Sequence, residues 1–467
     1  MHSERAFLEG PQERLLKWLA VGLISLVAFE ALAVATAMPT VVRSLEGQNL
    51  YALAMGITMA TQLIATALAG PWSDTRSPQS CLYAGVALFV LGLTICTLSP
   101  SMYIFVLGRG IQGFGGGLSM VPLYTIIGNH VHPSRQPPFF AAFAAAWVLP
   151  ALIGPGIAGL VVQYASWRLI FGFVPVVFLL AVPVLVKVTS ALPRTEPAES
   201  EGSTKRRMLL AIGAGISVAL LQVMSGTEPD SFTPPIFLVI AVSAVLTFAF
   251  MKPLLPVGTF SARRGLPSTV LLRGLANGAF IGVETFLPLL LQLVHGWEPA
   301  GAGLVLTVGS ITWAIGSAVS GRIADREVRA KLPVVGTVIQ LVGSVVTFAG
   351  VFEGVPGAVI IIGWTITGLG IGLVYPTMTV HALAMTRTKN KGKTSSALQM
   401  ADTLGAAFCV AAAGIAYALV LPNLSPAFAA AVGLMIVILV MAVPIARRTR
   451  PYPGSDEEVQ LLESEQL

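Results

Sequence analysis

Charged residues are scarce in this chain. Only 11% of its 467 residues are Asp, Glu, Lys or Arg, whereas 55% are hydrophobic and the mean hydropathy is +0.81. A soluble domain holds about 25% charged residues, so no water-soluble core would absorb this much apolar sequence. The composition therefore excludes a soluble globular protein and indicates one for which the lipid bilayer is the solvent.

Cysteine is also rare, and catalytic motifs are missing. Cys81, Cys96 and Cys409 lie in or beside apolar stretches, and they form neither a CxxC pair nor a metal-ligand spacing. The sequence contains no HExxH motif, no phosphate-binding loop and no Ser-His-Asp arrangement. We therefore expect no disulfide framework, no metal, no cofactor and no enzyme activity.

Apolar stretches of about 20 residues, the length that crosses the hydrocarbon core, recur along the chain. The sequence predicts an all-α membrane protein with about 14 transmembrane helices, near residues 15–38, 51–70, 80–98, 102–128, 139–164, 167–186, 207–226, 235–251, 268–293, 302–322, 333–352, 356–384, 396–420 and 426–446.

The basic residues lie almost entirely on one side of this pattern. With the N-terminus placed in the cytoplasm, 24 of the 28 Lys and Arg fall in cytoplasmic segments. Arg43 and Arg168 fall outside, and Arg109 and Arg273 lie within spans. This excess predicts both termini in the cytoplasm. The net charge of +6 is then a topology signal, and we expect no nucleic acid as a partner.

The two polar ends carry little structural information. Residues 1–14 are predicted to be a cytoplasmic N-terminus, and the span that follows is too long for a cleaved signal peptide. Residues 447–467 form a cytoplasmic acidic tail whose composition is typical of disorder. Its EEVQLL stretch is similar to an acidic dileucine sorting signal, although six-residue matches are common by chance.

Two short stretches recur in the two halves of the chain. AGPWSD (69–74) is echoed by SGRIAD (320–325), and GFGGGLSMVP (113–122) is echoed loosely by GLGIGLVYP (368–376). Such repeats are common in transporters. They predict a six-helix bundle over 15–186, a cytoplasmic linker over 187–206, two extra helices over 207–252 and a second six-helix bundle over 253–446.

Four stretches resemble motifs of a known family. They are FEALAVATAMPTVV (29–42), GRGIQGFGGG (108–117), PALIGPGIAG (150–159) and PVGTFSARRGLPSTVL (256–271) followed by FLPLLLQLVHGW (286–297). Over residues 15–446 the chain resembles the major facilitator superfamily, and within it the fourteen-helix drug:proton antiporter branch. The resemblance implies the major facilitator fold and export driven by a proton gradient, and the motif at 150–159 marks exporters.

The chain also departs from the pattern of that family. GPWSDTRSPQS keeps Gly70 and Asp74 but lacks the expected basic run and second glycine, while GRIADREVRAK keeps Gly321, Asp325 and Arg326. The first-helix acid, usually Asp, is Glu30 here. The gate on the first side is therefore expected to be weaker or to use other partners.

Four ionisable residues within spans are candidates for proton coupling: Glu30, Arg109, Glu284 and Asp402. A charge in the hydrocarbon region is costly and usually functional. At 1.5 Å per residue, Glu30, Arg109 and Glu284 lie roughly 10 to 15 Å from the outer ends of their spans. In the family fold Glu30 would meet Arg109. A carboxylate that alternates between an arginine and a closed apolar cavity would gain and lose a proton.

Each of these candidates has an alternative interpretation. Glu30 and Arg109 would also fit a static ion pair that holds two helices, or Glu30 would extend to an outer water pocket. Glu284 would also fit a binding group for a cationic substrate. Asp402 would either line the cavity or bond a neighbouring helix. Arg273, near the inner end of its span, is expected to extend to the membrane surface.

Small residues and helix-end carboxylates are the candidates for gating. Asp74 and Asp325 would meet the positive end of a following helix or an arginine of another helix, or else lie solvated in a loop. Gly and Pro residues in the fifth span would let it bend or slide, or would only pack tightly. The full gating set is Gly70, Asp74, Gly154, Pro155, Gly156, Gly159, Gly321, Asp325 and Arg326.

Polar and aromatic side chains at mid-depth are the candidates for substrate binding: Gln112, Phe143, Trp147, Asn277, Gln292, Trp313 and Tyr375. A mostly apolar cavity with a few acids suits small amphipathic organic compounds. The sequence thus predicts a monomeric, proton-coupled exporter of such compounds in a plasma or inner membrane. The alternatives are an exporter of an endogenous lipid, amino acid or metabolite, and a non-transporting receptor or scaffold of transporter ancestry.

Overall fold

The computed structural model describes residues 10–75, 77–132, 135–190, 202–323, 325–386 and 391–450. The proposed sorting signal lies outside these residues. So do most of the N-terminal segment and much of the linker between the halves.

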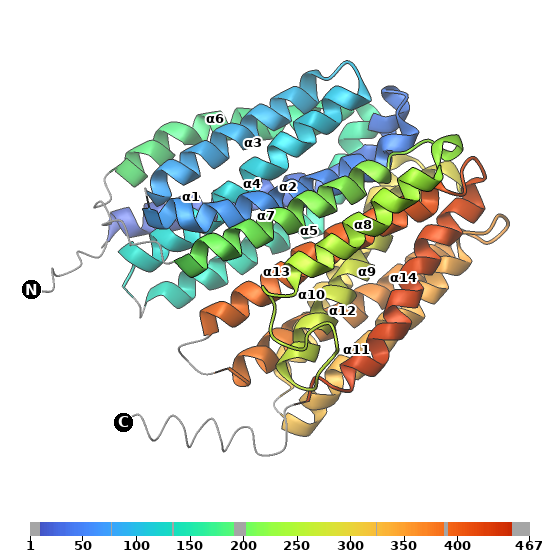
Figure 1. Ribbon diagram of the computed structural model, residues 1–467. Helices are drawn as coiled ribbons and strands as arrows, with labels where there is room; N and C mark the ends of the chain where they lie inside the picture. Colours follow the sequence, from blue (N-terminus) through green and yellow to red (C-terminus); the bar gives the residue numbers. More distant parts are fainter. Residues whose placement is uncertain are drawn as a thin grey trace, which may run out of the picture. The chain divides into compact units, whose positions relative to one another are not determined.

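Fourteen α-helices account for nearly all of the described chain, and the described ranges contain no strand (Figure 1). They are α1 (Pro11–Ser44), α2 (Tyr51–Thr75), α3 (Pro78–Leu98), α4 (Met102–His130), α5 (Gln136–Tyr164), α6 (Trp167–Ser190), α7 (Gly202–Met224), α8 (Pro234–Met251), α9 (Leu266–Leu293), α10 (Pro299–Arg322), α11 (Arg326–Ala349), α12 (Ala358–Ala384), α13 (Lys391–Ala418) and α14 (Leu424–Ala446). The predicted all-α fold class is confirmed, with one helix for each predicted span.

Thirteen helices in the described ranges are long and apolar enough to cross a membrane, and α4 is not among them. The reason lies in its composition, because Arg109, Gln112 and a run of glycines lower its hydropathy. Arg109 and Gln112 are both candidate site residues, so the polar groups that lower the hydropathy of α4 are ones expected to act in the site.

The first helix is longer than the sequence predicts. The predicted span ends at Met38, but α1 continues through Pro39 to Ser44. Proline removes one backbone hydrogen bond, and membrane helices tolerate this where neighbouring helices cover the freed carbonyl. Pro39, Val41 and Val42 are all buried, so packing holds the last turns in place.

Several helix ends carry the residues that favour helix initiation. Ser77 and Ser101 accept hydrogen bonds from Ser80 N and Ile104 N at the starts of α3 and α4. Asp325 accepts bonds from Glu327 N and Val328 N, 2.8 and 3.0 Å long, at the start of α11. Such caps satisfy N–H groups that have no partner within the helix.

The contacts divide the chain into two compact units. The first comprises residues Met1–Ala219 with Glu298–Leu304, and the second comprises Leu220–Trp297 with Val305–Leu467. In the first unit α1 packs on α5 and α6, α4 packs on α2 and α3, and α3 packs on α6. In the second unit α9 packs on α13 and α14, α12 packs on α11, and α11 packs on α14. By these contacts α1, α3, α4, α5 and α6 correspond to α9, α11, α12, α13 and α14, the helices eight places later.

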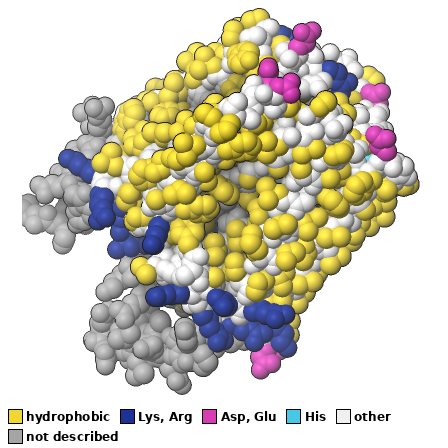
Figure 2. Space-filling model, turned by 45° about the vertical axis from the view of Figure 1, so that its right-hand side comes forward, with side chains coloured by type: hydrophobic (Ala, Val, Ile, Leu, Met, Phe, Trp, Pro, Cys, Tyr) yellow, Lys and Arg dark blue, Asp and Glu magenta, His cyan; other side chains and the backbone are white. Residues whose placement is uncertain are grey.

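The helices present large hydrophobic side chains to their surroundings. Leu180 in α6 and Leu238 in α8 are among many that are well exposed. Figure 2 shows such side chains as broad yellow areas along the helices, whereas Lys and Arg gather near helix ends. This distribution is what a helix surface in contact with lipid requires.

Candidate transport site

Glu30 of α1 and Arg109 of α4 form a buried ion pair in the first unit. Arg109 Nη1 donates a hydrogen bond of 2.6 Å to Glu30 Oε1, and the two residues are only 4% and 3% exposed. The same Nη1 donates to Gln112 Oε1 at 2.5 Å, and Nε donates to the Ala54 carbonyl at 3.3 Å. Glu30 therefore receives one hydrogen bond from a guanidinium that also bonds two neutral acceptors.

Close helix packing places Arg109 at this position. A side chain at Gly113, one turn after Arg109, would collide with the Thr58 backbone of α2. The absence of a Cβ at this residue thus lets α4 lie against α2, which also supplies the Ala54 carbonyl. The glycine-rich stretch of α4 is a packing surface here.

Arg273 of α9 and Asp402 of α13 form a second buried pair, in the second unit. Arg273 Nε donates to both carboxylate oxygens at 2.9 Å, and Nη2 donates to Oδ2 at 2.7 Å. Tyr375 of α12 donates its hydroxyl to Oδ2 at 2.8 Å, and Arg273 Nη1 donates to Thr379. Asp402 therefore bonds neighbouring helices, which is one of the two alternatives that the sequence left open.

The expectation for Arg273 is wrong. It was predicted to extend to the membrane surface, yet it is only 7% exposed and lies 4.0 Å above the Tyr375 ring. A bidentate carboxylate and an aromatic face offset the cost of burying a guanidinium, so it does not need to reach water. The sequence places Arg273 and Asp402 near the same predicted side of their spans, but it does not show that these two spans are neighbours.

Two glycines bring α9 and α13 close enough for this pair. A Cβ on Gly405 would collide with the carbonyl of Gly274, and a Cβ on Gly274 would lie 2.9 Å from the Ala401 carbonyl oxygen. Because both positions lack a side chain, the two backbones approach closely beside Arg273 and Asp402.

Three of the predicted substrate residues gather around the second pair. Asn277 donates to the Asp402 carbonyl at 3.3 Å, and the rings of Trp313 and Tyr375 lie 5.5 Å apart. Phe280, which the sequence did not suggest, lies 4.9 Å from Trp313 and stacks on Trp364 at 4.5 Å. Aromatic residues are common in apolar spans, so the sequence offered no reason to choose Phe280 or Trp364. Only the contacts of Phe280 with Trp313 and Trp364 place these two residues beside this pair.

Glu284 has a different environment from the other embedded acids. It lies on α9, eleven residues after Arg273, and is half-buried. Within the described part of the chain it forms no hydrogen bond or ion pair. It shares a helix face with Asn277 and Ile281, which are also partly accessible. This face leads from the Arg273 pair to Glu284.

The remaining substrate candidates do not gather around the second pair. Gln112 belongs to the first pair, whereas Gln292 is buried near the end of α9. Phe143 is buried with its ring 5.4 Å from that of Tyr124. Trp147 is 45% exposed and forms no ring contact among the described aromatic residues.

The predicted gating glycines of α5 differ in how closely they pack against other helices. A Cβ at Gly159 would lie 2.6 Å from Ala300 Cα, so α5 packs closely on the start of α10, and Gly303 approaches the Pro155 carbonyl there. Gly154 has only ordinary contacts, the nearest to Phe29, and Gly156 continues the same helix.

The helix-end glycines and acids complete this set. A Cβ at Gly70 or Gly321 would meet nothing within 4 Å, so neither position needs glycine for packing. Asp325 caps α11, as one alternative anticipated. The side chains of Asp74 and Arg326 lie outside the described part.

The comparisons with known proteins agree with this architecture. The family model described as Major Facilitator Superfamily matches residues 19–353 and 285–464. The chain belongs to the major facilitator superfamily. A chain of this superfamily with so many apolar helices is a multi-pass membrane protein, and its relatives are transporters.

Among these relatives are named multidrug transporters. Multidrug transporter protein MdtP of Bacillus subtilis is 23% identical over 406 residues, which are 85% of this chain and 74% of that protein. Multidrug efflux pump SdrM of Staphylococcus aureus is 24% identical over 84% of this chain and 87% of its own length.

Solved structures of other superfamily members share the fold. A D-xylose–proton symporter matches with a TM-score of 0.66 at 15% identity, over 94% of this chain and 98% of that chain. A peptide transporter in complex with sulfate matches with a TM-score of 0.65 at 15% identity, over 95% and 97%.

Proposed function

We propose that this protein is a proton-coupled antiporter that exports small amphipathic organic compounds by alternating access. The Glu30–Arg109 pair is the observation that carries the proposal. The multidrug relatives support the substrate class, because they match most of the chain. The proposal includes a plasma or inner membrane location with both termini in the cytoplasm, a monomeric protein, and protons and a small molecule as its partners.

The coupling step depends on the fact that Arg109 bonds one charged acceptor, Glu30, and two neutral acceptors. When Glu30 takes up a proton from outside, its carboxylate charge is lost and its hydrogen bond to Arg109 weakens. Arg109 then keeps the Gln112 and Ala54 oxygens as neutral acceptors. When Glu30 releases the proton to the inside, the ion pair forms again. One proton thus enters for each cycle of this pair, while the substrate leaves.

Glu284 and Asp402 take separate roles in this proposal. Glu284, which bonds no described residue, receives either a proton or the cationic group of a substrate. Asp402 is held by Arg273 and Tyr375, and it positions the aromatic wall formed by Tyr375 and Trp313. A mostly apolar cavity with few polar groups fits amphipathic compounds.

Transport in reconstituted vesicles with an imposed pH gradient tests the proposal. With a fluorescent cationic amphipathic dye, Glu30→Gln should lower gradient-driven flux by at least about tenfold, or about 1.4 kcal/mol. It should preserve exchange of labelled for unlabelled dye, because that exchange moves no net proton. Glu13→Gln is the matched control, since Glu13 lies on the same helix in a salt bridge with Arg135 at the protein surface. It should leave flux unchanged.

Two outcomes would contradict this function. Unchanged gradient-driven flux in Glu30→Gln, Glu284→Gln and Asp402→Asn would leave none of the embedded acids with the role proposed for it. No gradient-driven flux of any compound by the wild-type protein would favour a receptor or scaffold instead.

A further inference from the structure

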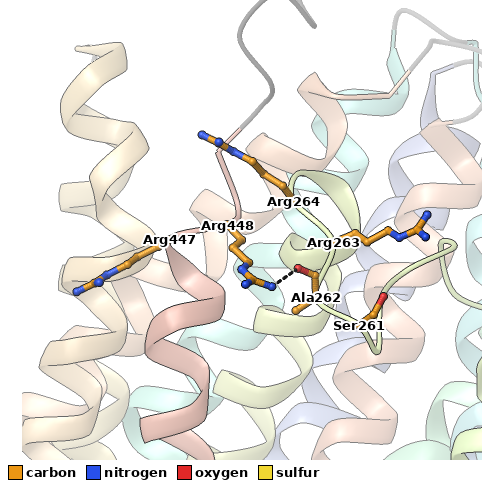
Figure 3. Close-up of a pocket in the computed structure, with 6 residues that line it drawn as sticks. All are labelled: Ser261, Ala262, Arg263, Arg264, Arg447 and Arg448. Carbon is orange, nitrogen blue, oxygen red and sulfur yellow. Dashed lines mark hydrogen bonds between the residues drawn. The ribbon is translucent and has the colours of Figure 1, made fainter.

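A basic hollow lies at one end of the second unit, and none of the residues that line it belongs to either ion pair. It has a volume of about 390 Å³ and is lined by Ser261, Ala262, Arg263, Arg264, Arg447 and Arg448. Figure 3 shows that these residues come from two segments, the loop between α8 and α9 and the end of α14. Four arginines from segments about 180 residues apart in sequence therefore meet around one space.

The loop that forms one wall has a defined shape. Arg448 donates from Nη1 to the Ala262 carbonyl at 3.3 Å, and Gly265 N donates to the Arg448 carbonyl at 2.8 Å. Ser268 Oγ donates to the Arg263 carbonyl at 2.6 Å. Ala262 has a φ of 49°, a conformation that is rare for residues other than glycine. The two segments are thus joined by hydrogen bonds, and the hollow is a built feature.

The charge of the hollow is not balanced by its lining. No acid is among the six lining residues, and Arg263, Arg447 and Arg448 form no ion pair with any described acid. In Figure 3 the side chains of Arg263 and Arg447 extend in different directions, and Arg448 points toward the Ala262 carbonyl that it bonds. The excess of Lys and Arg in cytoplasmic segments explains why each of the two segments is basic. It does not explain why arginines of both segments line the same hollow.

The same loop carries exposed apolar side chains. Val257 is 84% exposed, and Phe260, adjacent to the hollow, is 37% exposed. The Phe260 ring meets that of Phe248 edge-on at 5.4 Å, and Phe248 lies on the hydrophobic outer face of α8. An arginine-lined hollow beside an apolar helix face matches a molecule with an anionic head and a hydrocarbon tail.

We propose that this hollow binds the phosphate group of an anionic membrane lipid, with its acyl chains along α8. Arginine binds phosphate oxygens with two parallel hydrogen bonds, and basic pockets at helix ends are suited to lipid headgroups. The flexible stems of Arg263 and Arg447 allow their guanidinium groups to turn toward a shared phosphate. The site is separate from the transport pathway proposed above.

Native mass spectrometry of the full-length protein tests this site. Protein released from nanodiscs that contain equal amounts of phosphatidylglycerol and phosphatidylcholine should retain phosphatidylglycerol. Arg447→Gln with Arg448→Gln should lower this retention by about 25-fold at low ionic strength, at a factor of about five per arginine. Arg206→Gln with Arg207→Gln, an equal loss of charge on exposed residues of α7, should change it by less than about twofold.

Three further arms separate the proposed lipid from other occupants. Arg447→Lys with Arg448→Lys keeps the topology signal, and it should lower retention by several-fold because lysine lacks the paired donors. Displacement of the lipid by millimolar inorganic phosphate would show a free-phosphate site and overturn the proposal. A chain that ends at Arg450 should retain the lipid as the wild type does. A strong gain of retention in that chain would make the acidic tail the occupant, and equal losses in both double-glutamine variants would show non-specific charge attraction.

Discussion

Each of the two buried ion pairs joins an arginine to a carboxylate, but the two arginines distribute their hydrogen bonds differently. In the first unit Arg109 contacts one oxygen of Glu30 and divides its other bonds between Gln112 and Ala54. In the second unit Arg273 contacts both oxygens of Asp402, and Tyr375 adds a further bond. If Glu30 is protonated, Arg109 still has two other acceptors. Asp402, by contrast, links α13 to α9 and α12 through its bonds with Arg273 and Tyr375.

The largest expected effect is on the second pair. Asp402→Asn should lower the free energy of unfolding by about 3 kcal/mol, because it leaves a buried guanidinium without its counter-charge. Unfolding by SDS in bicelles measures this change. The double variant Arg273→Leu with Asp402→Leu should recover most of the loss, since it removes both charges. A double variant as unstable as the single one would show that packing, and not charge, dominates.

A smaller effect is expected where α9 meets α13. Gly405→Ala should cost about 1 to 3 kcal/mol, because the new methyl group would collide with the Gly274 carbonyl and separate the helices that hold the pair. The thermal midpoint in detergent measures it. Gly321→Ala is the matched control and should leave the midpoint unchanged, because its Cβ has no neighbour within 4 Å. An equal loss in both variants would show that the collision with Gly274 is not the cause of the loss.

The Tyr375 hydroxyl contributes one bond to the second pair. Tyr375→Phe should lower the free energy of unfolding by about 0.6 to 1 kcal/mol, the usual range for a hydrogen bond between membrane helices. The ring contacts with Arg273 and Trp313 remain in this variant. A loss near that of Asp402→Asn would show that the tyrosine, and not Arg273, is the main partner of the carboxylate.

Of the two charge variants, the smaller loss of stability is expected in the first pair. Glu30→Gln weakens one charge-assisted bond of Arg109, whereas Asp402→Asn weakens three bonds of Arg273. Glu30→Gln should therefore cost less than about 2 kcal/mol, and less than Asp402→Asn. Its large effect should be on proton-driven flux alone. The same SDS titration compares it directly with Asp402→Asn, and equal losses in the two variants would remove the distinction between an exchangeable and a fixed pair.

The sequence predicted the spans better than the contacts. Hydrophobic length is a local property, so each helix was found within a few residues, apart from the extension of α1 to Ser44 and the earlier start of α11. Glu30 and Arg109 were recognised as embedded charges that would meet in the family fold. Arg273 was misjudged, because its distance from the helix end was visible in the sequence and its partner was not.

Hydropathy and charge by themselves determined that this chain is an all-helical membrane protein with ionisable groups deep in its spans, since each signal is contained in about 20 neighbouring residues. Only the tertiary structure decided how those groups are paired. Glu30 and Arg109 are 79 residues apart, and Arg273 and Asp402 are 129 apart. Their contacts depend on how closely whole helices approach, which small residues such as Gly113 and Gly405 permit, and no local pattern records that distance.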